Sequence, residues 1–182
     1  MDLAIPELCL VVLVGPSGSG KSTFAAVHFK PTEVISSDHC RALVSDDENN
    51  LAATPAAFRV LHSIAGERLR LGRLTVIDAT SVQPDARKPL IALAHEHGSR
   101  AVAIVLGLPE SVCIERNRQR PQRNLAPRVV RRQHRLMRRS IENIEAEGFH
   151  RVFVLDSTEA VETATIVREP LASEPIRPRD NP

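Results

Sequence analysis

The stretch from Leu8 to Ser22, LCLVVLVGPSGSGKS, decides the fold. Residues 8–14 are apolar without interruption, which is typical of a strand buried on both faces of a parallel sheet. Residues 15–22 match the pattern G-x-x-x-x-G-K-[ST], and a helical segment follows from Lys21 to about Phe29. Strand, glycine-rich turn and helix in this order predict a phosphate-binding loop, or P-loop.

The residue types of this loop suit a nucleotide. Glycines let successive backbone N–H groups converge on phosphate oxygens, and the helix N-terminus adds positive potential. Lys21 is expected to reach the β- and γ-phosphates of ATP or another NTP, and the Ser22 hydroxyl to coordinate Mg²⁺. We expect the nucleotide to be held by Gly15, Ser17, Gly18, Ser19, Gly20, Lys21, Ser22 and Thr23.

Strands and helices alternate along the rest of the chain. We expect strands over 33–37, 74–78, 101–106 and 151–155, and helices over 54–71, 84–97, 110–119 and 128–147, the last being the longest. Thr54 is the predicted N-cap of the first of these helices. The alternation predicts an α/β protein of three layers, α/β/α, around a central, mostly parallel sheet of about five strands.

The pattern stops near Arg168, so we predict a domain over 1–168. Residues 169–182 contain four prolines and are predicted to be a linker or disordered tail leading to further modules.

Composition excludes several classes of protein. No apolar run approaches the roughly 18–20 residues of a membrane span, and the acidic, proline-containing N-terminus is not a signal peptide. The three cysteines form no C-x-x-C pair, which argues against a disulfide scaffold or a zinc finger and fits a reducing, cytoplasmic location.

The net charge of +2 hides an uneven distribution. Ten arginines and no acidic residue lie in 116–139, so the rest of the chain has 14 basic and 22 acidic residues. A concentrated positive segment on an otherwise acidic body suits a polyanionic partner. The chain has no Trp and no Tyr, which excludes a large aromatic platform for stacking bases.

Two aspartates follow expected strands, at the edge where ligands bind to parallel sheets. Asp78 ends the strand 74–78 in a Walker-B-like position suited to holding Mg²⁺, with a helix cap as the alternative. Asp38 follows the strand 33–37 and can accept the proton of an attacking hydroxyl; the alternative is an N-cap for a helix beginning near His39. Arg41 favours catalysis, because a transferring phosphoryl group gains from a nearby cation.

The arginine segment divides into two parts. Arg116, Arg118, Arg120 and Arg123 lie at a helix end and in the loop after it, as in the arginine-rich lid of small P-loop kinases. Further arginines gather on one face of the helix 128–147, opposite an apolar stripe. That face is either a solvated surface or a binding surface for phosphates, and we assign Arg128 and Arg131 to acceptor binding. Arg87 either reaches the same crevice, and we assign it to acceptor binding as well, or lies on the surface.

Together the motifs resemble one family, the 5′-OH polynucleotide kinase domain of the bacterial end-healing and RNA-repair enzyme polynucleotide kinase-phosphatase. The resemblance covers residues 1 to about 168. It rests on GPSGSGKSTFA (15–25), EVISSDHCRALVSDDEN (33–49), LTVIDATSVQPDARKPL (74–90) and LPESVCIERNRQR (108–120). The first block fits many P-loop proteins, whereas the second is much more discriminating.

The resemblance implies an adenylate-kinase-like fold with a lid, and transfer of the γ-phosphate of ATP, with Mg²⁺, to the 5′-hydroxyl end of RNA or DNA. It matches Asp38 to the general base, Arg41 to an arginine near the acceptor and the transferred phosphate, and Arg116 to a lid arginine on the nucleotide phosphates. Arg120 and Arg123 lie near that position. It also implies phosphatase and ligase modules on the same polypeptide.

Two other functions share some of these features. A kinase of a sugar, nucleoside or antibiotic has the loop, the aspartate and the lid, but a small acceptor needs only a few cations. A non-catalytic, nucleotide-dependent switch explains the loop and the charge but leaves Asp38 and Arg41 without a role.

Overall fold

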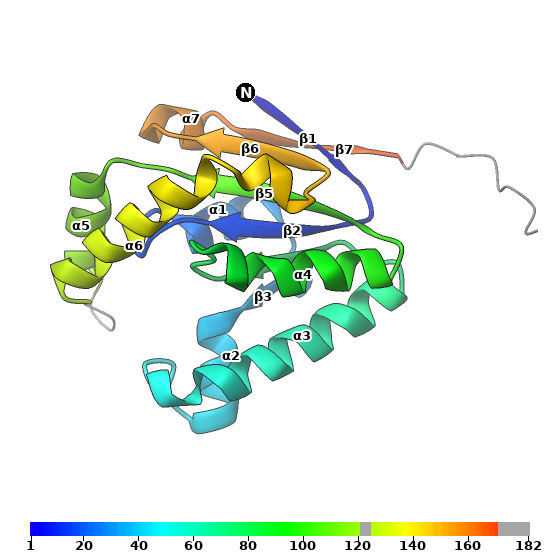
Figure 1. Ribbon diagram of the computed structural model, residues 1–182, viewed down its shortest axis with the longest axis horizontal. Helices are drawn as coiled ribbons and strands as arrows, with labels where there is room; N and C mark the ends of the chain where they lie inside the picture. The colour runs from blue at the N-terminus through cyan, green and yellow to red at the C-terminus, as the bar shows by residue number, and fades with distance from the viewer. Residues whose placement is uncertain (121–124, 171–182) are drawn as a thin grey trace, which may run out of the picture.

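The computed structural model describes residues 1–120 and 125–170. Its central sheet has five parallel strands in the order β3-β4-β2-β5-β6 (Figure 1). The strands are β2 (Cys9–Val14), β3 (Val34–Ser36), β4 (Thr75–Asp78), β5 (Arg100–Leu106) and β6 (Arg151–Leu155). The α/β class and the parallel sheet of about five strands are therefore confirmed.

Helices connect the strands and cover both faces of the sheet. The α-helices are α1 (Lys21–His28), α2 (Ser37–Ser45), α3 (Thr54–Arg70), α4 (Pro84–Glu96), α5 (Glu110–Arg118), α6 (Pro127–Ile141) and α7 (Thr158–Glu162). Short 3₁₀ turns are η1 (Pro31–Glu33), η2 (Leu51–Ala53) and η3 (Ile144–Glu147).

Strand β2 lies at the centre of the core, and all six of its side chains are fully buried. Because side chains alternate along a strand, Leu10, Val12 and Val14 pack into the apolar cluster formed with α3, α4 and α6. The intervening residues pack into a second cluster, which includes α1 and the first strand of the chain. This alternation explains why the uninterrupted apolar run belongs to the middle of the sheet.

Three details of the helices differ from the sequence predictions. The helix expected over 128–147 ends at Ile141, because the chain leaves helical geometry at Asn143 and forms η3, which inserts Ile144 into the core. The longest helix among the described residues is α3, with 17 residues against 15 in α6. Thr54 is helical itself and is not the N-cap, since Ala53 occupies that position.

A second sheet was not predicted from the sequence. It pairs β1 (Asp2–Pro6) with β7 (Thr165–Glu169) in parallel. Figure 1 shows this pair beside β6, above it in the view. The guanidinium of Arg168 fastens it to the body through two hydrogen bonds of 2.9 and 2.8 Å to the Glu33 carboxylate. The predicted domain limit at 168 falls inside β7, and 171–182 of the predicted tail lie outside the described residues.

The three cysteines are free thiols in the core. Burial raises the pKa of Cys9 to about 12, with Arg168 acting in the opposite direction. A thiol of this kind is a packing group and not a nucleophile. Over the described residues, none of the helices is long and apolar enough to cross a membrane.

The Glu33–Arg168 pair predicts an acid-sensitive contribution to stability. Burial by itself raises the pKa of Glu33, but hydrogen bonds and charge from Arg168, with help from Lys30, bring it below its ordinary value. The stabilisation is therefore complete at neutral pH and is lost as the pH falls from the ordinary pKa through the lower value of the folded state.

We expect Glu33→Gln to lower the free energy of unfolding by about 1–2 kcal/mol at neutral pH, and by much less in acid. Urea denaturation of both proteins across this pH range measures the difference. The control is Glu96→Gln, at an exposed position of α4. A difference that does not shrink in acid would contradict the role of the Glu33 charge.

Candidate functional site

The P-loop connects β2 to α1 and needs glycine at two crowded positions. At Gly18, where φ is +82°, a Cβ atom would lie 2.1 Å from the carbonyl oxygen of Cys113 in α5. At Gly15, a Cβ would lie 2.9 Å from the carbonyl oxygen of Leu106. Contacts below 3 Å are not tolerated between such atoms, so the loop packs directly against β5 and α5 only because these residues lack side chains.

Lys21 begins α1 and lies back across the loop. Its side chain is buried, and Nζ donates hydrogen bonds of 2.9 Å to the carbonyl oxygens of Gly15 and Pro16. The cation is thus held at the mouth of the loop, where phosphate oxygens are expected. Ser22, next along α1, is exposed.

A small cavity of about 30 Å³, the central cavity, lies at this mouth. It is lined by Ser17, Lys21, Ser22, Ser37, Asp38, Asp78, Ala79, Thr80 and Arg120. The structure therefore brings together residues predicted from four separate parts of the sequence, namely the P-loop, Asp38, Asp78 and Arg120. Asp78 arrives there because it ends β4, in register with Ser36 at the end of β3.

The donor set of the central cavity fits a magnesium ion. A hydroxyl at Ser22 and a carboxylate at Asp78 are hard oxygen ligands, and Mg²⁺ usually takes its remaining ligands from water and substrate phosphates. Across the described ranges, no cluster of three or more His, Cys, Asp or Glu side chains offers an alternative metal site.

Asp38 lies in the first turn of α2 and does not cap it. The cap is Ser36, whose Oγ accepts hydrogen bonds from the backbone N–H groups of Asp38 and His39 at 3.2 and 3.4 Å. The Asp38 carboxylate forms an ion pair with Arg41 one turn on. Arg41 is 4% exposed, and its Nε also donates a 2.7 Å hydrogen bond to the Glu48 carbonyl oxygen. Burial lowers the pKa of Arg41, while the Glu48 charge raises it.

A second pocket opens on the far side of Asp38. This α3–α6 pocket has a volume of about 380 Å³ and lies between α2, α3, α6 and the loop after β4. Ser37, Asp38 and Thr80 line both it and the central cavity, so the two are adjacent. Apolar groups such as Phe58 and Leu136 form part of its wall, together with the cations Arg41 and Arg132.

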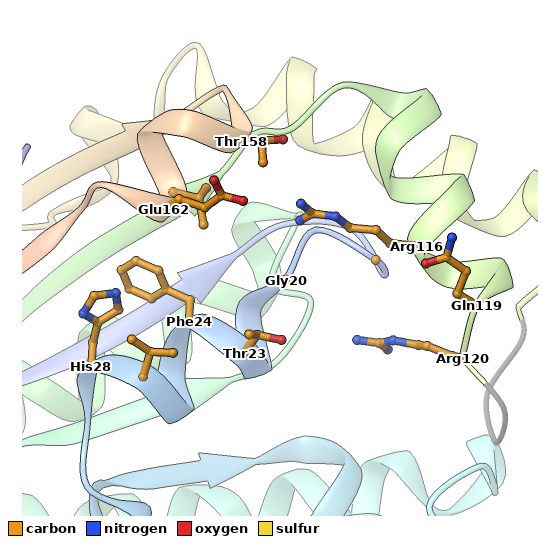
Figure 2. A pocket seen from close by; sticks show the side chains of 12 residues that line it. Gly20, Thr23, Phe24, His28, Arg116, Gln119, Arg120, Thr158 and Glu162 are labelled. Carbon is orange, nitrogen blue, oxygen red and sulfur yellow. The ribbon is translucent and has the colours of Figure 1, made fainter.

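A third pocket lies on the opposite side of the loop. This α1–α7 pocket has a volume of about 540 Å³ and is bounded by the P-loop, α1, the end of α5 and α7. Figure 2 shows Arg116 and Arg120 extending across it from the α5 side, with Thr23, Phe24 and His28 on α1. Arg116 Nη1 lies 3.5 Å from the position that a Cβ would take at Gly20. Arg120 also lines the central cavity.

The remaining predicted arginines are placed differently. Arg123 lies outside the described residues. Arg128 and Arg131 are exposed on α6, and Arg131 Nε lies 3.5 Å from the Glu110 carboxylate of α5. Arg87 has no exposed surface, which corrects its assignment to acceptor binding. Its guanidinium is engaged by Glu147 and donates a 2.8 Å hydrogen bond to the Ser81 carbonyl oxygen.

Sequence reasoning missed Gln133. Its Oε1 accepts a 2.8 Å hydrogen bond from the backbone N–H of Ser17, which joins α6 to the P-loop across 116 residues of sequence. The signal was its position, three residues after buried Val130 and four before buried Met137. A polar side chain at such a core-facing position needs a polar partner.

The fold and the site define a P-loop kinase of the small, adenylate-kinase-like type, since the loop, its lysine and an arginine-bearing α5 meet at the carboxyl end of a parallel sheet. The family follows from comparison. The family model AAA_33, described as "AAA domain", matches residues 10–144, and the chain belongs to this family.

Several known proteins are similar to this chain in structure or in sequence. A chain of the Pnkp1/Rnl/Hen1 RNA repair complex superposes with a TM-score of 0.65 at 20% identity, covering 76% of this chain and 47% of that one. A gluconokinase from Sinorhizobium meliloti gives 0.52 at 20% identity, covering 87% and 90%. The Arabidopsis thaliana protein called transcription factor bHLH140 is 30% identical over 161 residues, or 85% of this chain and 17% of its own length. This chain thus spans about a sixth of that relative.

Two substitutions at Gln133 distinguish the effect of losing its hydrogen bond to Ser17 from the effect of adding a negative charge at this position. Gln133→Ala leaves the Ser17 N–H without its acceptor, and we expect a lower melting temperature and a several-fold higher KM for ATP. Gln133→Glu still accepts that hydrogen bond but brings a negative charge beside the phosphates. We expect it to keep the melting temperature and to raise the KM for ATP more than alanine does.

Steady-state kinetics and thermal unfolding of both variants make this comparison. Equal ATP affinity in wild type and Gln133→Glu would show that the Gln133 side chain does not face the phosphates.

Proposed function

We propose that the chain is a 5′-hydroxyl polynucleotide kinase, which transfers the γ-phosphate of ATP to the 5′-OH end of RNA or DNA and so prepares ends for ligation. The observation that carries the proposal is the position of Asp38. It lines both the central cavity, beside Lys21, and the α3–α6 pocket, one side of which is formed by the arginine-rich helix α6. A hydroxyl that enters from that pocket reaches the Asp38 carboxylate, which on its other side borders the cavity beside the P-loop.

The nucleotide takes the other half of the site. Its base and sugar occupy the α1–α7 pocket, and its phosphates lie on the P-loop with Arg116 and Arg120 above them. Mg²⁺, held by Ser22 and Asp78, neutralises charge on the β- and γ-phosphates when bound. The resemblance in the four sequence blocks supports the same division of roles.

The reaction is a direct displacement. The acceptor O5′ attacks the γ-phosphorus, the bond from that phosphorus to the β–γ bridging oxygen breaks, and the O5′ proton passes to the Asp38 carboxylate. Lys21, Arg41 and Arg116 stabilise the charge on the transferring group. Arg41 also orients the base, because its ion pair and its bond to the Glu48 carbonyl fix the carboxylate.

The decisive experiment is transfer of labelled γ-phosphate from ATP to a short 5′-OH RNA, beside the same RNA already bearing a 5′-phosphate. We expect label on the 5′-OH strand alone, and a DNA pair tests the range of acceptors. No label on any strand while ATP still binds would contradict the proposal. In that event a panel of sugars, nucleosides and antibiotics would identify a metabolite kinase, and slow hydrolysis without an acceptor would indicate a switch.

Asp38→Asn tests the general base. The amide keeps the shape and one hydrogen-bond acceptor for Arg41 but cannot take a proton, so we expect kcat to fall by about 10²–10⁴ with little change in the KM for ATP. Asp46→Asn is the matched control, because Asp46 ends the same helix away from the pockets and asparagine tolerates its left-handed φ of 55°. Turnover of Asp38→Asn near that of the control would contradict the assignment.

A further inference from the structure

The exposed face of α6 carries six arginines, which the helical period sorts into two groups. Residues spaced by three and four lie along one side of a helix. One line, here called the inner row, consists of Arg128, Arg132, Arg135 and Arg139. The remaining two, Arg131 and Arg138, are one heptad apart and form the outer pair.

The contacts of α6 show where each group faces. Arg132 lines the α3–α6 pocket together with Val129, Gln133 and Leu136. The other three arginines of the inner row lie before and after Arg132 on the same side of the helix. Arg131 of the outer pair faces α5, since its Nε lies 3.5 Å from the carboxylate of Glu110, a residue in the first turn of α5. Arg138 lies on the same side of α6, one heptad further on. In Figure 1, α6 runs across the sheet from the neighbourhood of α5, with α4 below it.

The inner row is a set of like charges without counter-ions. In the part of the chain that the structure describes, its four arginines form no ion pair, and no acidic residue occurs in α6. Like charges three and four residues apart repel each other on a helix. A bound polyanion relieves that repulsion, whereas a small metabolite filling the pocket does not reach beyond Arg132.

The dimensions suit a single strand. Arg139 lies eleven positions after Arg128, which at 1.5 Å per residue is about 16 Å, or roughly five phosphates of a stacked strand. Helix α6 contains no Phe, Trp or Tyr. Along the inner row, charge on the backbone, and not base stacking, is therefore the available source of affinity.

We propose that the inner row binds the sugar-phosphate backbone of the acceptor strand downstream of its 5′ end, so that this kinase selects extended single strands over mononucleotides and dinucleotides, without regard to sequence. This rests on the proposed function and deepens it. The path includes Arg128 but leaves out Arg131, whose side chain faces Glu110.

The test compares two variants that lose the same charge. Arg135→Gln/Arg139→Gln removes half of the inner row. Arg138→Gln/Arg70→Gln removes one arginine of the outer pair and one exposed arginine at the end of α3. KM is measured for a 5′-OH dinucleotide and for a 5′-OH strand of about ten nucleotides, each over a range of salt concentrations.

We expect wild type to prefer the long strand. The inner-row variant should raise the KM for that strand roughly tenfold and leave the KM for the dinucleotide unchanged. For the long strand, the slope of log(1/KM) against the logarithm of the salt concentration should become shallower by about 1.4, or 0.7 for each lost phosphate contact. The control should stay within about twofold of wild type on both acceptors.

The two possible failures differ. If the dinucleotide and the long strand have the same KM, or both variants behave alike, the strand does not follow the inner row, while phosphorylation of either acceptor still supports the kinase. If wild type phosphorylates no oligonucleotide although it binds ATP, the proposed function falls and the acceptor path falls with it.

Discussion

All six side chains of β2 are buried, and hydrogen bonds to β4 and β5 occupy both of its edges. Because β2 is enclosed on both faces and both edges, the chain leaves it at the carboxyl end of the sheet, where Gly15 begins the turn. The turn is then pressed against α5 so closely that Gly18 has no room for a Cβ atom. The phosphate site is therefore a consequence of core packing, and its geometry is as rigid as the sheet below it.

Polar contacts from α6 and α4 fix the position of the α3–α6 pocket, on the acceptor side of the site. Gln133 ties α6 to Ser17, and Ser140 Oγ donates a 2.7 Å hydrogen bond to the Val82 carbonyl oxygen in the loop after β4. Arg87 binds the same loop at Ser81, a non-glycine residue held at a φ of 43°. Buried charges are costly unless fully paired, and the Glu147 carboxylate supplies that pairing for Arg87. These bonds hold the wall of the α3–α6 pocket at a set position relative to the P-loop.

Local patterns made much of this predictable. The apolar run of β2, the glycine loop and the aspartates that end or follow β3 and β4 are signals read within a few residues, and the Asp38–Arg41 pair spans a single helical turn. Distant contacts were not readable. The sequence did not reveal the burial of Arg87, because its partner Glu147 lies 60 positions away. The predicted length of α6 was too great, because the helix ends where the turn at Asn143 brings Ile144 into the core. The β1–β7 sheet was not predicted because each of these short strands is recognised only by its pairing with the other, more than 150 residues away.

That small sheet has a mechanical consequence. Since β1 and β7 run parallel, from Asp2 opposite Thr165 to Pro6 opposite Glu169, the chain enters the pair at one end and leaves it at the other. A pull between Met1 and any segment joined beyond Glu169 is directed along the strands. The load is then shared by the whole ladder of hydrogen bonds in shear, and the bonds do not open one by one as in a hairpin that is pulled apart. The load path from Met1 to Glu169 therefore runs through the β1–β7 ladder and not along β2, which contacts β1 through the apolar cluster that contains Leu3 and Ile5.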